Sequence, residues 1–175
     1  MPAFSRRSGA LELIDRPQPR DKWERALVFL RRINRFLGGT RAVLWHFRRW
    51  SRGWRPGERI EILDAGCGAG DIPLALARWG RRAGFDLRVY GLDPCPECAR
   101  AAARDTGAEV SVFRGDALRT PLRSVDYVTA SLLFHHLDDE RCVRALREFD
   151  AVARRGIVVN DLLRRRRAWL WAAAL

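Results

Sequence analysis

The feature that most constrains this chain is a set of three glycines at alternating positions, placed directly after an apolar segment. That segment, residues 59–64, is expected to form a buried strand, and residues 70–81 are expected to form a helix. The glycines between them are Gly66, Gly68 and Gly70. Glycine permits a tight turn and lets the backbone lie against a ligand, and the following helix aims free N–H groups at the same place. The combination predicts a site for a nucleotide or nucleoside.

The residues flanking the glycines discriminate between kinds of nucleotide. A dinucleotide fingerprint has glycine or alanine at the sixth position, where this chain has Asp71, and the Gly-Lys-Ser/Thr of a P-loop is absent. Asp64 and Asp71 stand at the two ends of the loop and would repel a pyrophosphate. A ligand with a cationic amino group and no phosphate fits better, and S-adenosylmethionine (SAM) is such a ligand.

Two further acids follow the next two predicted strands. Asp93-Pro94 ends the second strand, where a carboxylate can accept hydrogen bonds from both ribose hydroxyls. Asp116-Ala117 follows the third strand, where a carboxylate can accept a hydrogen bond from the exocyclic amine of an adenine. The alternative is that each aspartate only caps a helix and each glycine only serves a turn.

Beyond residue 56, predicted strands and helices alternate regularly. Strands are expected at 59–64, 87–92, 109–113, 125–132 and 156–160, and helices at 70–81, 95–105, 139–153 and from 162. This alternation predicts an α/β protein with a Rossmann-like, doubly wound and mainly parallel sheet. We expect about five strands in the order 3-2-1-4-5.

Two amphipathic helices are expected before the sheet. Asp21 can cap the first helix, Gly38-Gly39 can end it, and Thr40 can cap the second. We therefore divide the chain into an N-terminal leader and helical lid, residues 1–56, and a SAM-binding Rossmann-like domain, residues 57–175.

In order and spacing, the glycine loop and the acids after it resemble class I SAM-dependent methyltransferases over residues 59–160. Two stretches look like those of family members that methylate quinones or polyketide-like phenols: Gly-Ala-Gly-Asp-Ile-Pro-Leu and Phe134-His135-His136-Leu137. The resemblance implies that Asp64, Gly66 and Gly68 hold the SAM tail, Asp93 the ribose and Asp116 the adenine. The full set of candidate cofactor residues is Asp64, Gly66, Cys67, Gly68, Gly70, Asp93, Pro94, Asp116, Ala117 and Ser131.

His135 and His136 are the candidate catalytic residues. They follow the fourth predicted strand, at the carboxyl end of the sheet where ligands bind in such folds. Methyl transfer to a hydroxyl benefits from a base, and one imidazole can take that proton or place the acceptor. The alternative is a histidine pair that only caps a turn or lines the pocket. Ser131-Leu132-Leu133-Phe134 departs from the Asn/Asp-Pro-Pro-Tyr/Phe motif of many amino-methylating enzymes, which disfavours adenine methylation.

The four cysteines include one C-x-x-C motif, Cys95 to Cys98. Such a motif can form a redox pair or half of a zinc site. No second cysteine pair exists, and the three histidines are distant in the sequence, so we expect no metal.

The formal net charge of +12 comes almost entirely from arginine, which favours polyanions such as nucleic acid. Some arginines cluster near tryptophans, at Arg6-Arg7, at Arg48-Arg49 with Trp50 and Trp54, and at 164–167 with Trp169 and Trp171. Because the arginines are spread along the whole chain, compositional bias and solvated helix faces explain them better. A nucleic-acid partner is the less favoured expectation.

No secretory signal or apolar run of membrane-spanning length is found, so a cytoplasmic protein is expected. The resemblance implies seven strands, whereas the sequence supplies five and ends in an apolar segment, residues 168–175. We therefore expect either a shortened chain or a sheet edge that a second copy or another partner covers.

These observations favour a methyltransferase that moves a methyl group from SAM to a small acceptor, at a phenol- or quinone-like hydroxyl or carbon. One alternative is a non-catalytic SAM-binding module completed by a partner. A second is an RNA methyltransferase that uses the positive charge.

Overall fold

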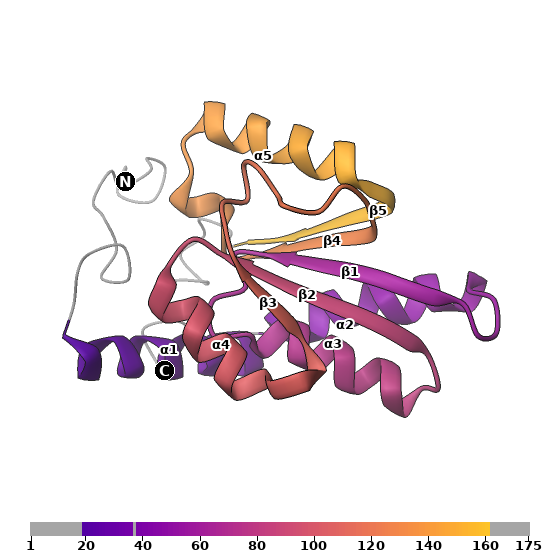
Figure 1. Ribbon diagram of the computed structural model, residues 1–175, viewed down its shortest axis with the longest axis horizontal. Helices are drawn as coiled ribbons and strands as arrows, with labels where there is room; N and C mark the ends of the chain where they lie inside the picture. The colour runs from indigo at the N-terminus through magenta and orange to yellow at the C-terminus, as the bar shows by residue number, and fades with distance from the viewer. Residues whose placement is uncertain (1–18, 37, 162–175) are drawn as a thin grey trace, which may run out of the picture.

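The structure, a computed structural model, describes residues 19–36 and 38–161 and shows a three-layer α/β arrangement (Figure 1). Its five strands form one sheet in the order β3-β2-β1-β4-β5, and all neighbouring strands are parallel. The strands are β1 (Arg59–Ala65), β2 (Asp86–Asp93), β3 (Ser111–Arg114), β4 (Val125–Ser131) and β5 (Ala153–Asn160). The predicted fold class and strand order are confirmed.

Helices cover both faces of the sheet. They are α1 (Arg20–Phe36), α2 (Gly39–Trp50), α3 (Asp71–Arg82), α4 (Pro96–Thr106) and α5 (Asp139–Val152). In Figure 1, α2, α3 and α4 lie on one side of the sheet and α5 lies on the other. The two helices expected before the sheet are thus present.

The apolar core follows the alternation of side chains along the strands. Ile60 and Ile62 of β1 are fully buried in one cluster with Phe47 of α2. Leu63, on the opposite face of the same strand, is fully buried with Phe149 of α5. Because α2 contributes to the core of the sheet, its position is fixed by packing. The predicted lid function of α1 and α2, and the boundary at residue 56, stay predictions.

Two predicted helix caps are wrong. α1 begins at Arg20, so Asp21 lies inside its first turn. α2 begins at Gly39, and its N-cap is Gly38 with φ 88°, a left-handed conformation that glycine adopts at little cost. Thr40 therefore lies within the helix. The second helix thus starts without a side-chain cap hydrogen bond.

Two strand boundaries also differ from expectation. β3 begins at Ser111 because a short 3-10 turn, Gly107–Glu109, follows α4. β5 begins at Ala153, directly after α5, and is longer than the predicted 156–160. The helix expected from residue 162 lies outside the described residues.

The strand order positions the site. β1 and β4 are neighbours at the centre, and the chain proceeds from them toward opposite edges of the sheet. In sheets of this kind ligands bind outside the carboxyl ends of the strands at such a switch point. In the described part of the chain, no helix combines the length and apolar character that a membrane span requires.

Candidate active site at the carboxyl edge of the sheet

The glycine loop between β1 and α3 is held against the end of β2. The N–H groups of Gly66 and Cys67 both donate to the carbonyl oxygen of Leu92, at 2.8 and 3.0 Å. Gly66, Gly68 and Gly70 have φ values of 72°, 53° and 77°, in the left-handed region that disfavours other residues. The loop therefore needs glycine at all three positions for its backbone conformation.

The surroundings of these glycines differ. A Cβ on Gly66 would lie 3.0 Å from Leu133, and one on Gly70 would lie 2.8 Å from Thr106, so both positions are closely packed. A Cβ on Gly68 would have no heavy atom within 4 Å. Gly68 thus exposes its backbone to open space, as required where a ligand lies against the main chain.

Asp93 is fixed by the loop and by the start of α4. Its side chain is buried, and its two carboxylate oxygens accept the N–H groups of Gly68 at 2.8 Å and Cys95 at 2.9 Å. Burial raises the pKa of Asp93, although the two N–H bonds and a charge on His136 act in the opposite direction. The predicted ribose acid is therefore oriented toward the loop before any ligand arrives.

Asp64, near the end of β1, is the most deeply buried acid of the site, at 2% exposure. The Thr129 hydroxyl of β4 donates to it at 2.5 Å. The pKa of Asp64 is raised to about 8, chiefly by burial; the charges of Asp71 and Asp93 contribute to the rise, and the Thr129 hydrogen bond opposes it. Burial also raises the pKa of Asp71. Three acids that disfavour one another's charge are thus gathered around the loop, where a cationic ligand would stabilise them.

Helix α1 supplies residues that sequence reasoning missed. The Asn34 side chain is buried and hydrogen-bonded to Asp71, and its Oδ1 atom lacks a hydrogen-bond partner among the described residues. The Arg31 guanidinium donates to the carbonyl oxygen of Ala69 at 3.3 Å and pairs with Asp105. Asn34 sits seven residues after the buried Leu27, so a polar residue on the apolar side of this helix was the available signal.

The other predicted cofactor residues have mixed surroundings. Asp116 is exposed, and one of its oxygens accepts the Leu118 N–H at 2.9 Å, a turn contact like that of the structural alternative. The Ala117 side chain is buried in the core beneath α5, so only its main chain could contact a ligand. Pro94 is exposed beside Asp93.

Cys67 and Ser131 lie at the same edge with packed side chains. The Cys67 sulfur would be 3.0 Å from a Cβ on Gly91, so the thiol fills the space over β2, and burial raises its pKa. Ser131 ends β4, and its hydroxyl accepts the Asn160 amide at 3.5 Å.

The two histidines occupy a short 3-10 turn, Phe134–His136, directly after β4. Asp161, which follows β5, contacts His135 Nδ1 through one oxygen at 2.7 Å. Its other oxygen accepts the N–H groups of Phe134 at 2.7 Å and His135 at 3.2 Å. The centroids of the His135 and His136 rings lie 4.1 Å apart. A carboxylate therefore orients His135, and sequence reasoning missed that acid although it directly follows the neighbouring strand β5.

The third histidine and two tryptophans lie elsewhere. His46 on α2 contacts the rings of Trp45 and Trp50. Trp50 stacks on Tyr127 at 4.7 Å, and Trp54 donates to the Tyr127 hydroxyl at 2.9 Å. These two tryptophans thus serve the core, as the structural alternative expects. The arginine and tryptophan clusters at residues 6–7 and 164–171 lie outside the described residues.

Comparison with known proteins identifies a family. A family model described as a methyltransferase domain matches residues 62–156, which is more than half of the chain. The match includes the glycine loop, Asp93, Asp116 and the histidine pair.

Individual relatives agree with this match. A ubiquinone biosynthesis O-methyltransferase of Methylocella silvestris is 37% identical over 101 residues, covering 53% of this chain and 37% of that protein. An uncharacterised methyltransferase of a Geobacillus species is 29% identical over 97 residues, covering 54% of this chain and 43% of that protein. The chain thus spans less than half the length of these relatives.

A solved structure shares the fold. It comes from Methanococcus maripaludis and is described as an S-adenosyl-L-methionine-dependent methyltransferase. The TM-score is 0.61 at 14% identity, and the alignment covers 91% of this chain and 73% of that protein.

Proposed function

The chain belongs to the methyltransferase domain family, within the class I SAM-dependent group, and from this premise we propose that it methylates a small acceptor. The acceptor would be a phenol- or quinone-like molecule that takes the methyl group on a hydroxyl or carbon. The observation that carries this proposal is the set of acids around a loop whose backbone is open at Gly68: Asp64 and Asp93 are buried, and Asp71 is half-buried.

The chain's own residues fit SAM at this edge. Asp64 and Asp71 provide carboxylates for a cationic amino group, and the Asn34 oxygen offers a buried acceptor near Asp71. Asp93 presents an oriented carboxylate for ribose hydroxyls, and Gly68 lets the backbone approach the ligand. When bound, SAM supplies a methyl group already activated by its sulfonium.

His135 is the residue we assign to the acceptor proton. The contact with Asp161 favours the tautomer that carries its proton on Nδ1, which leaves Nε2 able to accept one. A phenol, with a hydroxyl pKa near 10, gains from such a base during attack on a methyl group. An acceptor with an ionisable hydroxyl therefore matches this pair better than one without.

Two relationships support this acceptor class without identifying the molecule. The Methylocella silvestris relative is named for ubiquinone biosynthesis, and its similarity covers 53% of this chain. The turn after β4 carries Ser131-Leu132-Leu133-Phe134, which disfavours adenine as the acceptor.

We also infer a cytoplasmic location, and a second copy or partner chain along β5, whose Val159 is 43% exposed.

The test is a transfer assay with methyl-labelled SAM, the full chain, a panel of catechols and hydroquinones, and RNA in a parallel reaction. We expect label in one or more phenolic acceptors. SAM binding with no transfer to any acceptor would favour a non-catalytic SAM-binding module. Label in RNA, with binding that weakens steeply as salt increases, would favour the RNA alternative.

A further inference from the structure

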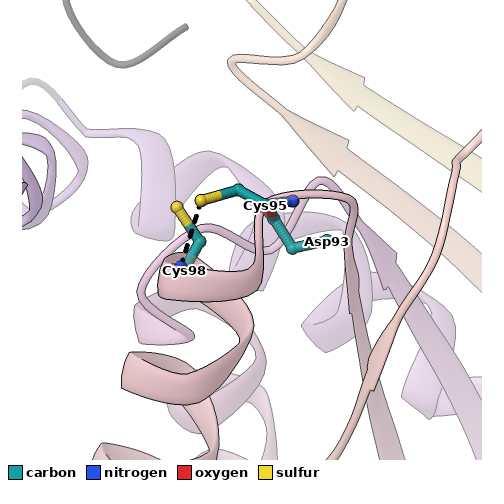
Figure 2. Close-up of side chains that lie close together, drawn as sticks. All are labelled: Asp93, Cys95 and Cys98. Atoms are coloured by element: carbon teal, nitrogen blue, oxygen red, sulfur yellow. Dashed lines mark hydrogen bonds between the residues drawn. The ribbon is translucent and has the colours of Figure 1, made fainter. Parts of the chain in front are cut away.

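Two cysteines and one aspartate converge where β2 passes into α4 (Figure 2). Asp93 ends β2, Cys95 is the N-cap of α4, and Cys98 lies in the first turn of that helix. A carboxylate oxygen and the two sulfurs lie within 4.8 Å of one another. Zn–S bonds of about 2.3 Å place two sulfurs less than about 4.6 Å apart, so small side-chain rotations can close the set around one ion.

Backbone donors already orient two of the three side chains. The Cys95 sulfur accepts the Cys98 N–H at 3.2 Å, the contact drawn in Figure 2. The Asp93 carboxylate accepts the Gly68 and Cys95 N–H groups. Metal ligands in proteins are commonly held by such outer hydrogen bonds, which fix their direction and reduce the cost of gathering them.

The surroundings shield the group partly from water. Cys98 is 3% exposed and packs in a small apolar cluster with Leu27 of α1 and Ala69 of the glycine loop. Cys95 contacts the same cluster and is only half-buried. One side of the group is therefore closed by apolar atoms, whereas the Cys95 side gives an ion a path from solvent.

We propose that Asp93, Cys95 and Cys98 form a binding site for a thiophilic divalent cation of the Zn²⁺ class, which competes with SAM for Asp93. Two thiolates and one carboxylate suit Zn²⁺ rather than Mg²⁺ or Ca²⁺, and a fourth position stays open to water. Each thiol gives its proton to the solvent as it binds the ion. The competition, though not the metal site itself, rests on the proposed function.

Cysteines and histidines alone do not predict a metal site in this sequence. The third ligand is an oxygen donor two residues before Cys95, and Asp93 already had another predicted role. An ion at this position would take the carboxylate that the ribose needs. A rise in available thiophilic metal would therefore lower the fraction of chain able to bind SAM.

The test is a titration with Co²⁺, whose tetrahedral thiolate complexes absorb visible light, on protein kept reduced by a phosphine. We expect one Co²⁺ per wild-type chain, displaced by Zn²⁺. Cys95→Ser keeps a good helix cap, and Cys98→Ala keeps a small apolar side chain in its cluster. Both variants should bind Co²⁺ at least about 10-fold more weakly, the lower end of the loss typical even for an outer-shell partner.

The matched control is Cys142→Ser, because Cys142 lies on α5 and contacts the carbonyl oxygens of Phe134 and Leu137. This variant should bind Co²⁺ as the wild type does. A wild-type chain without the thiolate–cobalt absorption would overturn the metal site. An equal absorption in Cys95→Ser and Cys98→Ala would overturn it as well.

The competition is tested by adding SAM to the Co²⁺-loaded protein. We expect the absorption to fall as SAM displaces the ion, and bound SAM with unchanged absorption would overturn the shared use of Asp93. SAM affinity measured in EDTA keeps the two proposals separate. A metal-free chain that does not bind SAM would contradict the proposed function and the competition, while the Co²⁺ absorption still decides the metal site.

Discussion

The acidic residues at the two ends of the sheet have different partners. At the amino end, Asp126 of β4 is buried but accepts the Glu61 N–H at 2.9 Å and lies 3.2 Å from Arg154 and 3.0 Å from Arg155. Glu58, also at that end, pairs with Arg155, whose hydrogen bond lowers the pKa of Glu58. The cost of an acid at this end is offset by arginine.

At the carboxyl end the acids are held by uncharged groups instead. Asp64 accepts a hydroxyl from Thr129, and Asp93 accepts backbone N–H groups. Burial raises the pKa of both. At the amino end the acids stabilise the fold through ion pairs. At the carboxyl end the carboxylates are desolvated, and a cationic ligand can lower the free-energy cost of their charge. Such perturbed groups in a site commonly mark function.

We expect the greatest loss of activity from a substitution of His135, at the carboxyl end of the sheet. His135→Asn removes the proposed base, whose ring Asp161 contacts, and we expect kcat to fall about 10²- to 10⁴-fold with SAM affinity nearly unchanged. His46→Asn on α2 is the control, because that ring packs between tryptophans. Steady-state methyl transfer measures both. Equal kcat in wild type and His135→Asn would remove the catalytic role and leave the structural alternative.

The next effect concerns the stability of the ligand-free chain. Because the folded-state pKa of Asp64 is about 8, well above that of an unfolded aspartate, the folded state keeps a proton that the unfolded state has lost. Stability is therefore lost as pH rises between about 4 and 8, by up to about 1.4 kcal/mol per pH unit. Asp64→Asn should flatten this slope and bind SAM more weakly.

Urea unfolding at pH 5, 6, 7 and 8 compares the two proteins, since groups distant from Asp64 and its neighbours Asp71 and Asp93 titrate equally in both. Asp126→Asn, at the amino end, is the matched control and should keep the wild-type slope while losing stability at every pH. Parallel slopes for wild type and Asp64→Asn would contradict the assigned protonation of Asp64.

A third comparison separates backbone strain from ligand approach. Gly57, in the turn before β1, and Gly68 have left-handed φ values of 73° and 53°, and a Cβ added at either residue would have no heavy atom within 4 Å. Alanine at either site should cost about 1–2 kcal/mol of unfolding free energy. Only Gly68→Ala should also weaken SAM binding. Equal SAM affinity in the two variants would place the ligand away from the loop.

The smallest effect probes the amino end alone. Arg155→Ala removes the ion pairs that Arg155 makes with Asp126 and Glu58, but leaves Arg154 and the Glu61 N–H beside Asp126. We expect a small loss of stability, because partly exposed ion pairs contribute little, and unchanged SAM affinity. A large loss of SAM affinity in this variant would show that the two ends are coupled.

The sequence predicted those parts of the site that are local in the chain. The apolar run of β1, the alternating glycines and the acid ending β2 each carry their signal within about ten residues. The strand order then places Asp64 and Asp93 together, because β1 and β2 pair in register from Arg59 to Ala65. Local sequence patterns, together with the strand order of a doubly wound sheet, thus predicted the glycine loop and the positions of Asp64 and Asp93.

The missed residues depend on contacts between distant segments. Asp161 reaches His135 because β5 pairs with β4 in a register that sets Asn160 beside Ser131. Thr129 meets Asp64 through the pairing of β4 with β1, and Asn34 arrives on a helix without a motif. No short pattern encodes such pairings. The N-cap at Gly38 carries no side-chain signal, because it depends on glycine's backbone freedom and makes no side-chain cap hydrogen bond.

If the carboxyl-end acids bind SAM and the amino-end acids do not, acids at the two ends of one strand must differ in their effect on SAM affinity. Calorimetric titration of SAM into Asp93→Asn and Asp86→Asn, which alter the two ends of β2, measures this difference. Asp86 pairs with Arg59 in solvent, so Asp86→Asn should bind SAM as the wild type does. Asp93→Asn should lose about 10- to 100-fold in affinity, the value of charged hydrogen bonds to the ribose. Equal affinity in the two folded variants would contradict the claim.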